Sequence, residues 1–290
     1  MISEFGVNSM SGKLRKVAIR RPSAILSADN KEWNYSKPLN QEGLLNQYAH
    51  FVTLLEDAGA EILWFDDTDD ALADSIFTYD PSFMLGSGSV LLRPGKEKRL
   101  GEVDVHRRFY ERSGIPIIGQ IESPGTLEGG DCFWLDEATL AVGKGFRSND
   151  AGISQLRDIV SAEGVEVIQF DLPFYKGPDA CLHLMSLVSP LDNDLALVFK
   201  PLLPDGLEEL MGEFGFDLIE ASESEFEESL GLSLNVLATE PRKVIAIHGF
   251  PETHRLMIES GCSVSLFNGD ELCIPCEGGP TCLTRPILRS

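Results

Sequence analysis

The sequence predicts a mixed α/β fold, a closed propeller of five ββαβ units with pseudo-fivefold symmetry. An amphipathic stretch that reaches a glycine and then a short apolar run occurs five times along the chain. The five glycines are 46 to 55 residues apart, and β-rich runs precede the later repeats. Units of roughly 50 residues cannot bury their own apolar faces, whereas five units stacked radially can. The repeat therefore favours a closed ring of units.

Each helix is expected to end at a glycine, because the residue after a helix favours a left-handed backbone that glycine adopts at low cost. These glycines are Gly59, Gly114, Gly164, Gly215 and Gly261. The apolar spacing predicts the helices before them over residues 44–58, 103–113, 153–163, 207–214 and 252–260. The apolar runs after them predict strands over residues 60–65, 115–119, 165–170, 216–221 and 262–267.

A pair of strands joined by a turn is expected before each of the last four helices. These pairs fall in residues 83–94, 132–143, 183–199 and 234–249, and each has turn residues in its middle. The first unit is less regular, because only the run 14–22 precedes a polar loop over residues 23–41.

The expected domain organisation is one catalytic α/β-propeller domain over residues 13–290, preceded by a loose segment over residues 1–12. No Pro/Ser-rich linker and no change of composition marks a boundary within the chain. An open α/β sheet is the alternative fold, and the regular spacing of the glycines argues against it.

Composition narrows the choice of partners and location. Of the 290 residues, 24 are Lys or Arg and 46 are Asp or Glu, so the formal net charge is -22. A surface this negative repels nucleic acid and anionic membranes, and neither is expected as a partner. No apolar run long enough for a membrane span and no apolar signal segment occurs, so we expect a cytoplasmic location with reduced thiols. The oligomeric state is left open, a homo-oligomer included.

Four residues could carry chemistry together. Asp80 lies in FTYDP, Glu128 in LEGGD, His183 in CLHLMS and Cys282 in GGPTCLT. Taken singly, the acids are typical of turns and the histidine of a core residue. In the repeat, the first three lie at or just ahead of the first β run of units two, three and four, and Cys282 lies at the closing strand of unit five. Such positions converge on one central mouth of a radial array, where a thiol, an imidazole and two carboxylates suit a guanidinium.

Several other residues of the same types are expected to be structural. We expect surface positions for four histidines, namely His50, His106, His248 and His254, and buried positions for three cysteines, namely Cys132, Cys181 and Cys262. Cys273 and Cys276 form a C-x-x-C, but a second pair that would complete a zinc site is absent from the sequence. We therefore expect no metal.

The motifs FTYDP, LEGGD, HLMS and GGPTCLT, in this order, resemble those of the guanidino-group-modifying enzymes, the pentein superfamily. The resemblance spans most of the chain and is closest to dimethylarginine dimethylaminohydrolase, which is related to arginine deiminase and the amidinotransferases. It implies the pentein fold, a fivefold propeller of ββαβ units. This is the architecture that the repeat predicts independently.

The resemblance also implies a role for each site residue. Cys282 would be the nucleophile, His183 the general acid–base, and Glu128 would hold the guanidinium and aid proton transfer. Asp80 would pair with the guanidinium nitrogens. The remaining expected substrate-binding residues are Arg147 in GKGFRSN, which would bind an α-carboxylate, Arg99 in RPGKEKRLGE, and Asp131 in LEGGD.

Two positions depart from related patterns. Arginine deiminases and amidinotransferases have an aspartate two residues after the histidine, and this chain has Met185 there. We expect the loss of that carboxylate to leave apolar room for N-methyl groups. Dimethylarginine dimethylaminohydrolases usually have Glu-Asp where this chain has Tyr79-Asp80, and the FT-x-D frame is closer to arginine deiminase.

The implied activity is cysteine-dependent hydrolysis at a guanidinium carbon, without a cofactor. The expected substrate is a small cationic guanidino compound, and N-methylated arginine would give citrulline plus methylamine or dimethylamine. Arginine deiminase and amidinotransferase activity at the same site are the alternatives. A non-catalytic binding protein of the same fold is a further alternative, which the presence of all four site residues disfavours.

Overall fold

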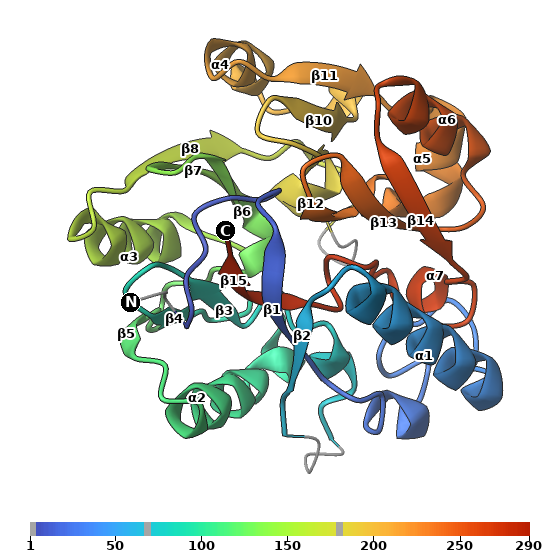
Figure 1. Ribbon diagram of the computed structural model, residues 1–290. Coiled ribbons are helices and arrows are strands. Elements are labelled where there is room, and N and C mark those ends of the chain that lie inside the picture. The colour runs from blue at the N-terminus through green and yellow to red at the C-terminus, as the bar shows by residue number, and fades with distance from the viewer. Residues whose placement is uncertain (1–3, 67–70, 178–181) are drawn as a thin grey trace.

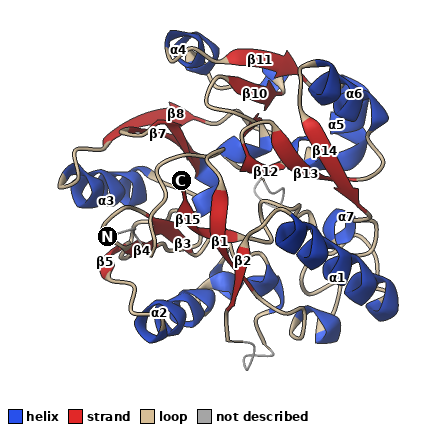
Figure 2. Cartoon of the chain, viewed as in Figure 1, coloured by secondary structure: helices blue, strands red, loops and turns tan. Residues whose placement is uncertain are grey.

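The computed structural model describes residues 4–66, 71–177 and 182–290. Within them the strands form five three-stranded sheets. Figure 1 shows the sheets arranged around a central axis, and Figure 2 shows that the long helices lie outside them. In every sheet the middle strand pairs antiparallel with one neighbour and parallel with the other. The predicted propeller of ββαβ units is confirmed.

Each of the five units holds one sheet. Unit one holds β15 (Arg285–Arg289), β1 (Leu14–Ile19) and β2 (Glu61–Trp64); unit two holds β3 (Ser82–Met84), β4 (Ser89–Leu91) and β5 (Ile117–Gln120). Unit three holds β6 (Cys132–Asp136), β7 (Thr139–Lys144) and β8 (Glu166–Asp171). Unit four holds β9 (Val188–Pro190), β10 (Leu195–Val198) and β11 (Asp217–Glu220); unit five holds β12 (Leu237–Glu240), β13 (Lys243–Ile247) and β14 (Ser263–Phe267).

One helix per unit connects the two parallel strands. These helices are α1 (Gln41–Asp57), α2 (Glu102–Arg112), α3 (Asp150–Ser161), α4 (Leu207–Glu213) and α6 (Pro251–Glu259). Two short helices, α5 (Glu223–Ser229) and α7 (Cys273–Cys276), lie in the connections between units. Among the described residues, no helix combines the length and the apolar character needed to cross a bilayer.

The glycines that end the five connecting helices have the backbone that the sequence predicts. Their φ angles are positive and run from 67° to 88°. A Cβ atom at four of these positions would meet nothing within 4 Å, namely at Gly59, Gly114, Gly164 and Gly215. The left-handed backbone, and not lack of space, therefore selects glycine at these four positions.

Unit one is completed by the end of the chain. Strand β15 pairs antiparallel with β1, so the first strand of unit one comes from the C-terminal segment. This explains why the first repeat lacks a strand pair in the sequence. It also corrects the assignment of Cys282, which precedes the first strand of unit one and does not belong to unit five. Asn235, just before β12, takes the corresponding place in unit five.

The N-terminal segment differs from the expected loose segment. Gly6 N donates to Ile287 O at 2.8 Å, and Arg289 N donates to Gly6 O at 3.0 Å. Val7 and Ser11 are buried. Residues 4–12 therefore pack along β15, because this edge of the strand has backbone groups available for pairing. Residues 1–3 lie outside the described residues.

Hydrogen bonds near the axis join each unit to the next. One such bond at each of the five junctions is Tyr79 N to Cys282 O (3.2 Å), Gly129 N to Asp80 O (3.1 Å), Leu184 N to Asp131 Oδ1 (2.9 Å), Ser189 Oγ to Leu234 O, and Thr281 N to Asn235 Oδ1 (3.0 Å). Most of these residues are site residues or their chain neighbours. The contacts that close the ring therefore also hold the site residues in place.

Two histidines expected at the surface are buried. His106 lies on the inner face of α2, with Nδ1 2.8 Å from Ser82 Oγ, and His254 Nε2 lies 3.0 Å from Ile247 O. Burial lowers the pKa of both imidazoles. The helical period places both side chains toward the sheets, a fact that their polar neighbours in the sequence conceal. His50 and His248 are exposed, as expected.

Candidate active site

A cavity of about 420 Å³ opens at the mouth of the propeller and collects most of the predicted site residues. Asp80, Arg99, Arg147, His183 and Cys282 line it. Its volume lies in the range typical of small-molecule sites. Asp80, His183 and Cys282 lie just ahead of the first strands of three units, and Arg99 and Arg147 lie just ahead of the connecting helices α2 and α3. Equivalent places in the fivefold repeat therefore explain why these side chains meet.

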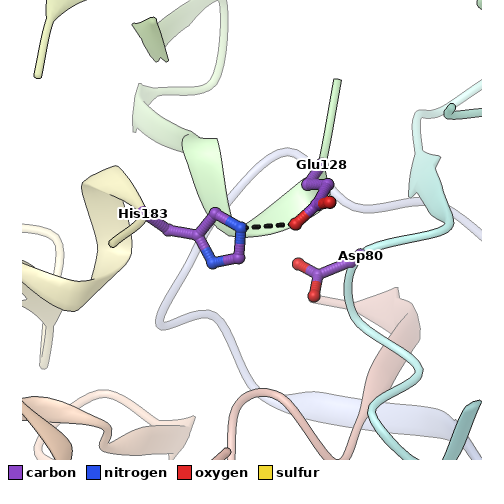
Figure 3. A group of neighbouring side chains, drawn as sticks. All are labelled: Asp80, Glu128 and His183. Atoms are coloured by element: carbon purple, nitrogen blue, oxygen red, sulfur yellow. Dashed lines mark hydrogen bonds and ion pairs between the residues drawn. The ribbon is translucent and has the colours of Figure 1, made fainter. Parts of the chain in front are cut away.

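Asp80, Glu128 and His183 form a compact group beside this cavity (Figure 3). One ligand-type atom from each lies within 4.8 Å of the others. Glu128 Oε2 is 2.7 Å from His183 Nε2, and Glu128 Oε1 accepts a hydrogen bond from Gly95 N at 2.9 Å. The carboxylate thereby fixes the orientation of the imidazole ring.

Glu128 is fully buried and yet remains ionised. Burial works to raise its pKa, but the hydrogen bond with His183 and the positive charge of Arg147 outweigh burial. Together they hold the pKa of Glu128 well below its usual range. Arg147 Nη1 lies 3.4 Å from Glu128 Oε2. The site therefore keeps a fixed negative charge at its base near neutral pH.

Arg99 lines the cavity, but most of its guanidinium is used inside the protein. Nη1 donates to Asp80 Oδ2 at 2.6 Å, and Nη2 donates to Phe77 O at 3.0 Å and to Glu102 Oε2 at 2.9 Å. Asp80 Oδ1 accepts a hydrogen bond from Gly130 N at 3.0 Å. Arg99 therefore positions the Asp80 carboxylate, and the substrate contact expected for it stays a prediction.

Cys282 lies in a turn three residues before β15 and is half-buried. Its Sγ accepts a hydrogen bond from Asn235 Nδ2 at 3.1 Å, and Asn235 Oδ1 accepts one from Thr281 N at 3.0 Å. Asn235 thus clamps the turn that carries the thiol. The sequence analysis does not name this residue. The repeat does contain a signal for it, because Asn235 is the unit-five counterpart of the other site positions.

The two glycines of LEGGD are required by close contacts. A Cβ atom at Gly130 would lie 2.5 Å from His183 Nδ1, and one at Gly129 would collide with the carbonyl oxygen of Tyr79. Any larger residue at position 130 would displace the imidazole. His183 itself precedes a 3₁₀ turn, Leu184–Ser186, and does not open a strand as the sequence suggested.

Asp131 has a different position from the one expected for a substrate-binding residue. It is fully buried, and its carboxylate accepts hydrogen bonds from Leu184 N at 2.9 Å and from Ser148 Oγ. Burial raises its pKa to about 6. Asp131 holds the backbone beside His183, and the substrate contact expected for it stays a prediction.

Tyr79 and Met185, the two residues that depart from the patterns of related enzymes, do not line this cavity. Tyr79 and Met185 both line a separate interior pocket of about 20 Å³. The Arg285 guanidinium stacks on the Tyr79 ring, 4.1 Å from its centroid. Met185 therefore packs in the core, and the apolar room expected at position 185 is not part of the cavity. The apolar walls of the cavity come instead from Trp33, Phe77 and Phe146.

The other cysteines fit the expected structural roles where they are described. Cys132 and Cys262 are buried, and Cys181 lies outside the described residues. Cys273 is buried, whereas Cys276 lines the same cavity as Cys282. The spacing of Asp80, Glu128 and His183 would also suit a metal ion, but Arg99 and Arg147 already offset the two carboxylates. The absence of a metal requirement stays a prediction.

Comparison with known proteins agrees with this geometry. The family model described as "N,N dimethylarginine dimethylhydrolase, eukaryotic" matches residues 16–289. A dimethylarginine dimethylaminohydrolase of Streptomyces coelicolor is 32% identical over 189 residues, which cover 65% of this chain and 69% of that protein.

Two solved structures share the fold. The citrulline complex of the Pseudomonas aeruginosa dimethylarginine dimethylaminohydrolase has a TM-score of 0.74 at 22% identity, covering 96% of this chain and 100% of that one. An amidinotransferase of Microseira wollei has a TM-score of 0.81 at 15% identity, covering 98% and 97%. The family match extends over nearly the whole propeller and includes every candidate site residue. The chain belongs to the N,N-dimethylarginine dimethylhydrolase family.

Proposed function

We propose that this chain hydrolyses the guanidinium C–N bond of an N-methylated arginine, giving citrulline plus methylamine or dimethylamine, with Cys282 as the nucleophile. One observation carries the proposal. The thiol of Cys282, the imidazole of His183 and the carboxylate of Asp80 share one cavity, and Glu128 is bonded to the same imidazole. Family membership supports hydrolysis of a C–N bond in a linear amidine. The similarity to the dimethylarginine dimethylaminohydrolases of Streptomyces coelicolor and Pseudomonas aeruginosa supports the methylated substrate.

Substrate binding would use the fixed negative charges of the site. A planar guanidinium can donate charge-assisted hydrogen bonds to Asp80 and Glu128, because each carboxylate oxygen has a second lone pair. The bound cation would in turn favour the thiolate of Cys282. Binding and activation of the nucleophile would therefore be coupled.

The first half of the reaction would form a covalent intermediate. The thiolate attacks the guanidinium carbon, and a C–S bond forms as the carbon becomes tetrahedral. His183 transfers its proton to the substituted nitrogen, the C–N bond breaks, and the amine leaves. A thiouronium on Cys282 remains.

The second half would consume one water molecule. His183, now neutral, takes a proton from water, and the oxygen attacks the thiouronium carbon. The C–S bond then breaks and the remaining hydroxyl proton passes to solvent, where the released amine takes up a proton, so that the neutral ureido product leaves and the thiolate is restored. A well-placed acid–base of this kind contributes about 10²–10⁴-fold. His183 carries a proton in both halves of this scheme.

The test is an assay for ureido products with asymmetric dimethylarginine, monomethylarginine and arginine. Cys282→Ser is expected to abolish turnover while preserving the thermal unfolding midpoint. Cys276→Ser is the matched control, because this thiol lines the same cavity and is expected to be dispensable. Turnover by purified Cys282→Ser would reject the nucleophile.

The product pattern separates the alternatives at the same site. Citrulline from arginine alone would indicate an arginine deiminase. Transfer of the amidino group to an added acceptor amine would indicate an amidinotransferase. Either result would retain the site and overturn the proposed substrate.

A further inference from the structure

We propose that Phe146 and Phe174 form an aromatic rim that binds an apolar group carried by the substrate at the end opposite to its guanidinium. The inference rests on the proposed function, because it takes the guanidinium to lie at Asp80 and Glu128. It adds the class of substrate that the outer part of the cavity selects.

The two rings are unusually exposed for their size. Phe174 is 75% exposed and Phe146 is 58% exposed, the two highest values among the large apolar side chains that the structure describes. They contact one another edge to face, with ring centroids 6.2 Å apart. Paired aromatic rings left in water, surrounded by polar residues, are typical of a surface that another apolar group covers.

Their position connects the pair to the substrate cavity. Phe146 lines the cavity that contains His183 and Cys282, and it directly precedes Arg147. Phe174 lies in the segment between β8 and His183 and touches Phe146 from outside. The aromatic rim is thus continuous with the reaction cavity. A substrate whose guanidinium reaches Glu128 would extend toward these rings.

Part of the charge on the outer wall is paired within the protein. Lys96 Nζ lies 2.6 Å from Asp74 Oδ2, and Lys98 Nζ lies 3.1 Å from Glu32 Oε1. Both ammonium groups also lie 5.2 to 5.4 Å from the ring centroid of Trp33. Glu97 and Glu277 line the wall as well. Beside these charged groups, the two phenylalanine rings offer an apolar surface to a substituent that extends from an arginine-like substrate.

The test measures binding in the Cys282→Ser variant, where turnover does not interfere. One arm compares monomethylarginine with its Nα-benzoyl derivative, and a second arm compares butylguanidine with octylguanidine, all by calorimetry. The apolar member of at least one pair is expected to bind about tenfold more tightly, the gain expected from roughly 50 Å² of apolar contact. A gain in the first arm alone would identify an acylated arginine, and a gain in the second an aliphatic guanidine.

Variants of the rim decide whether these rings cause the gain. Phe146→Ala combined with Phe174→Ala is expected to reduce the affinity ratio within the pair to about one. Ile258→Ala is the matched control, because this side chain on α6 is 56% exposed and lies outside the cavity. The control is expected to keep the full ratio.

The outcomes separate this inference from the proposed function. A ratio near one in both arms, no measurable binding of either apolar ligand, or a ratio that the double variant leaves unchanged would overturn the aromatic rim. Citrulline formation by the wild-type chain with a ratio near one would sustain the proposed function and reject the rim alone. A tenfold ratio without any ureido product from the wild type would do the reverse.

Discussion

Asp80 and Glu128, the two carboxylates of the candidate active site that lie beside His183, are each bonded to a cation of the protein. Asp80 is held by Arg99, and Glu128 by Arg147 and His183. Such pairs cost desolvation energy, and they contribute orientation more than net stability. At the scale of single residues, the structure therefore supports a preorganised site in which the acids already point at the place of the guanidinium.

The space around His183 gives a direct test of this preorganisation. Gly130→Ala would place a methyl group 2.5 Å from His183 Nδ1, so the imidazole must move. We expect kcat/KM on the accepted substrate to fall about 100-fold or more, since small displacements of catalytic groups have effects of this size. Gly212→Ala in α4 is the control, because its added methyl meets nothing within 4 Å. Full activity in Gly130→Ala with a folded chain would contradict the assigned role of His183.

The pKa of Glu128 predicts how acid affects stability. Because the folded-state pKa lies below the usual 4.5, ionisation of Glu128 stabilises the folded chain at all pH values above 4.5. That stabilisation is lost as the pH falls from 4.5 through the folded pKa. The free energy of unfolding of the wild type should therefore exceed that of Glu128→Gln at pH 5 and 7. Urea unfolding at pH 7, 5, 4 and 3 should show this difference shrink below 4.5, and a difference that grows there would be the opposite result.

The residues of the site differ in how visible they are in the sequence. Asp80, Glu128, His183 and Cys282 have reactive groups and recognisable motifs, so pattern and resemblance indicate them. Asn235 has an amide with no reactivity, and its importance depends on a turn 46 residues away. Contacts of this kind arise only when the ring closes, which local patterns do not describe.

At the scale of elements, the unit is defined by its helix end. Five glycines with positive φ turn the chain from the outer helix back to the parallel strand. This part of the fold is predictable because it is local: the helix period, the glycine and the apolar run are adjacent in sequence. The sharing of unit one between the two ends of the chain is not local, so the sequence left that unit irregular.

A helix stop can be tested without touching the site. Gly114 has a φ of 67°, and its environment is open. Gly114→Ala should lower the free energy of unfolding by about 1 kcal/mol, the usual cost of a left-handed backbone for a residue with a Cβ. Gly114→Asn should lose less, because asparagine tolerates this conformation better. Urea unfolding measures both values, while kcat/KM should stay at the wild-type level. Equal stability of all three chains would show that this turn does not need a left-handed residue.

At the scale of the whole molecule, the charges of the site carboxylates are offset by nearby cations, whereas the chain as a whole is strongly acidic. The site acids are compensated within about one side-chain length, yet the chain as a whole has a formal net charge of -22. Excess charge of one sign destabilises the compact state through self-repulsion. The same field attracts a cationic substrate. Stability and substrate capture therefore respond to salt with opposite signs.

The opposite responses of stability and of substrate capture to salt give a prediction that individual short-range contacts would not produce. At pH 7, raising NaCl from 0.02 to 0.3 M shortens the Debye length about fourfold. This change should raise the thermal unfolding midpoint, since repulsion between carboxylates weakens. Over the same range kcat/KM for asymmetric dimethylarginine should fall, because screening weakens the attraction of the cation. Sucrose at matched osmolarity is the control for exclusion effects, and it should raise the midpoint without lowering kcat/KM. If neither the unfolding midpoint nor kcat/KM changes with the salt concentration, ion pairing already cancels the acidic charge locally. The long-range electrostatic field of the chain would then contribute neither to stability nor to substrate capture. Only the carboxylates of the site would attract the guanidinium, at short range.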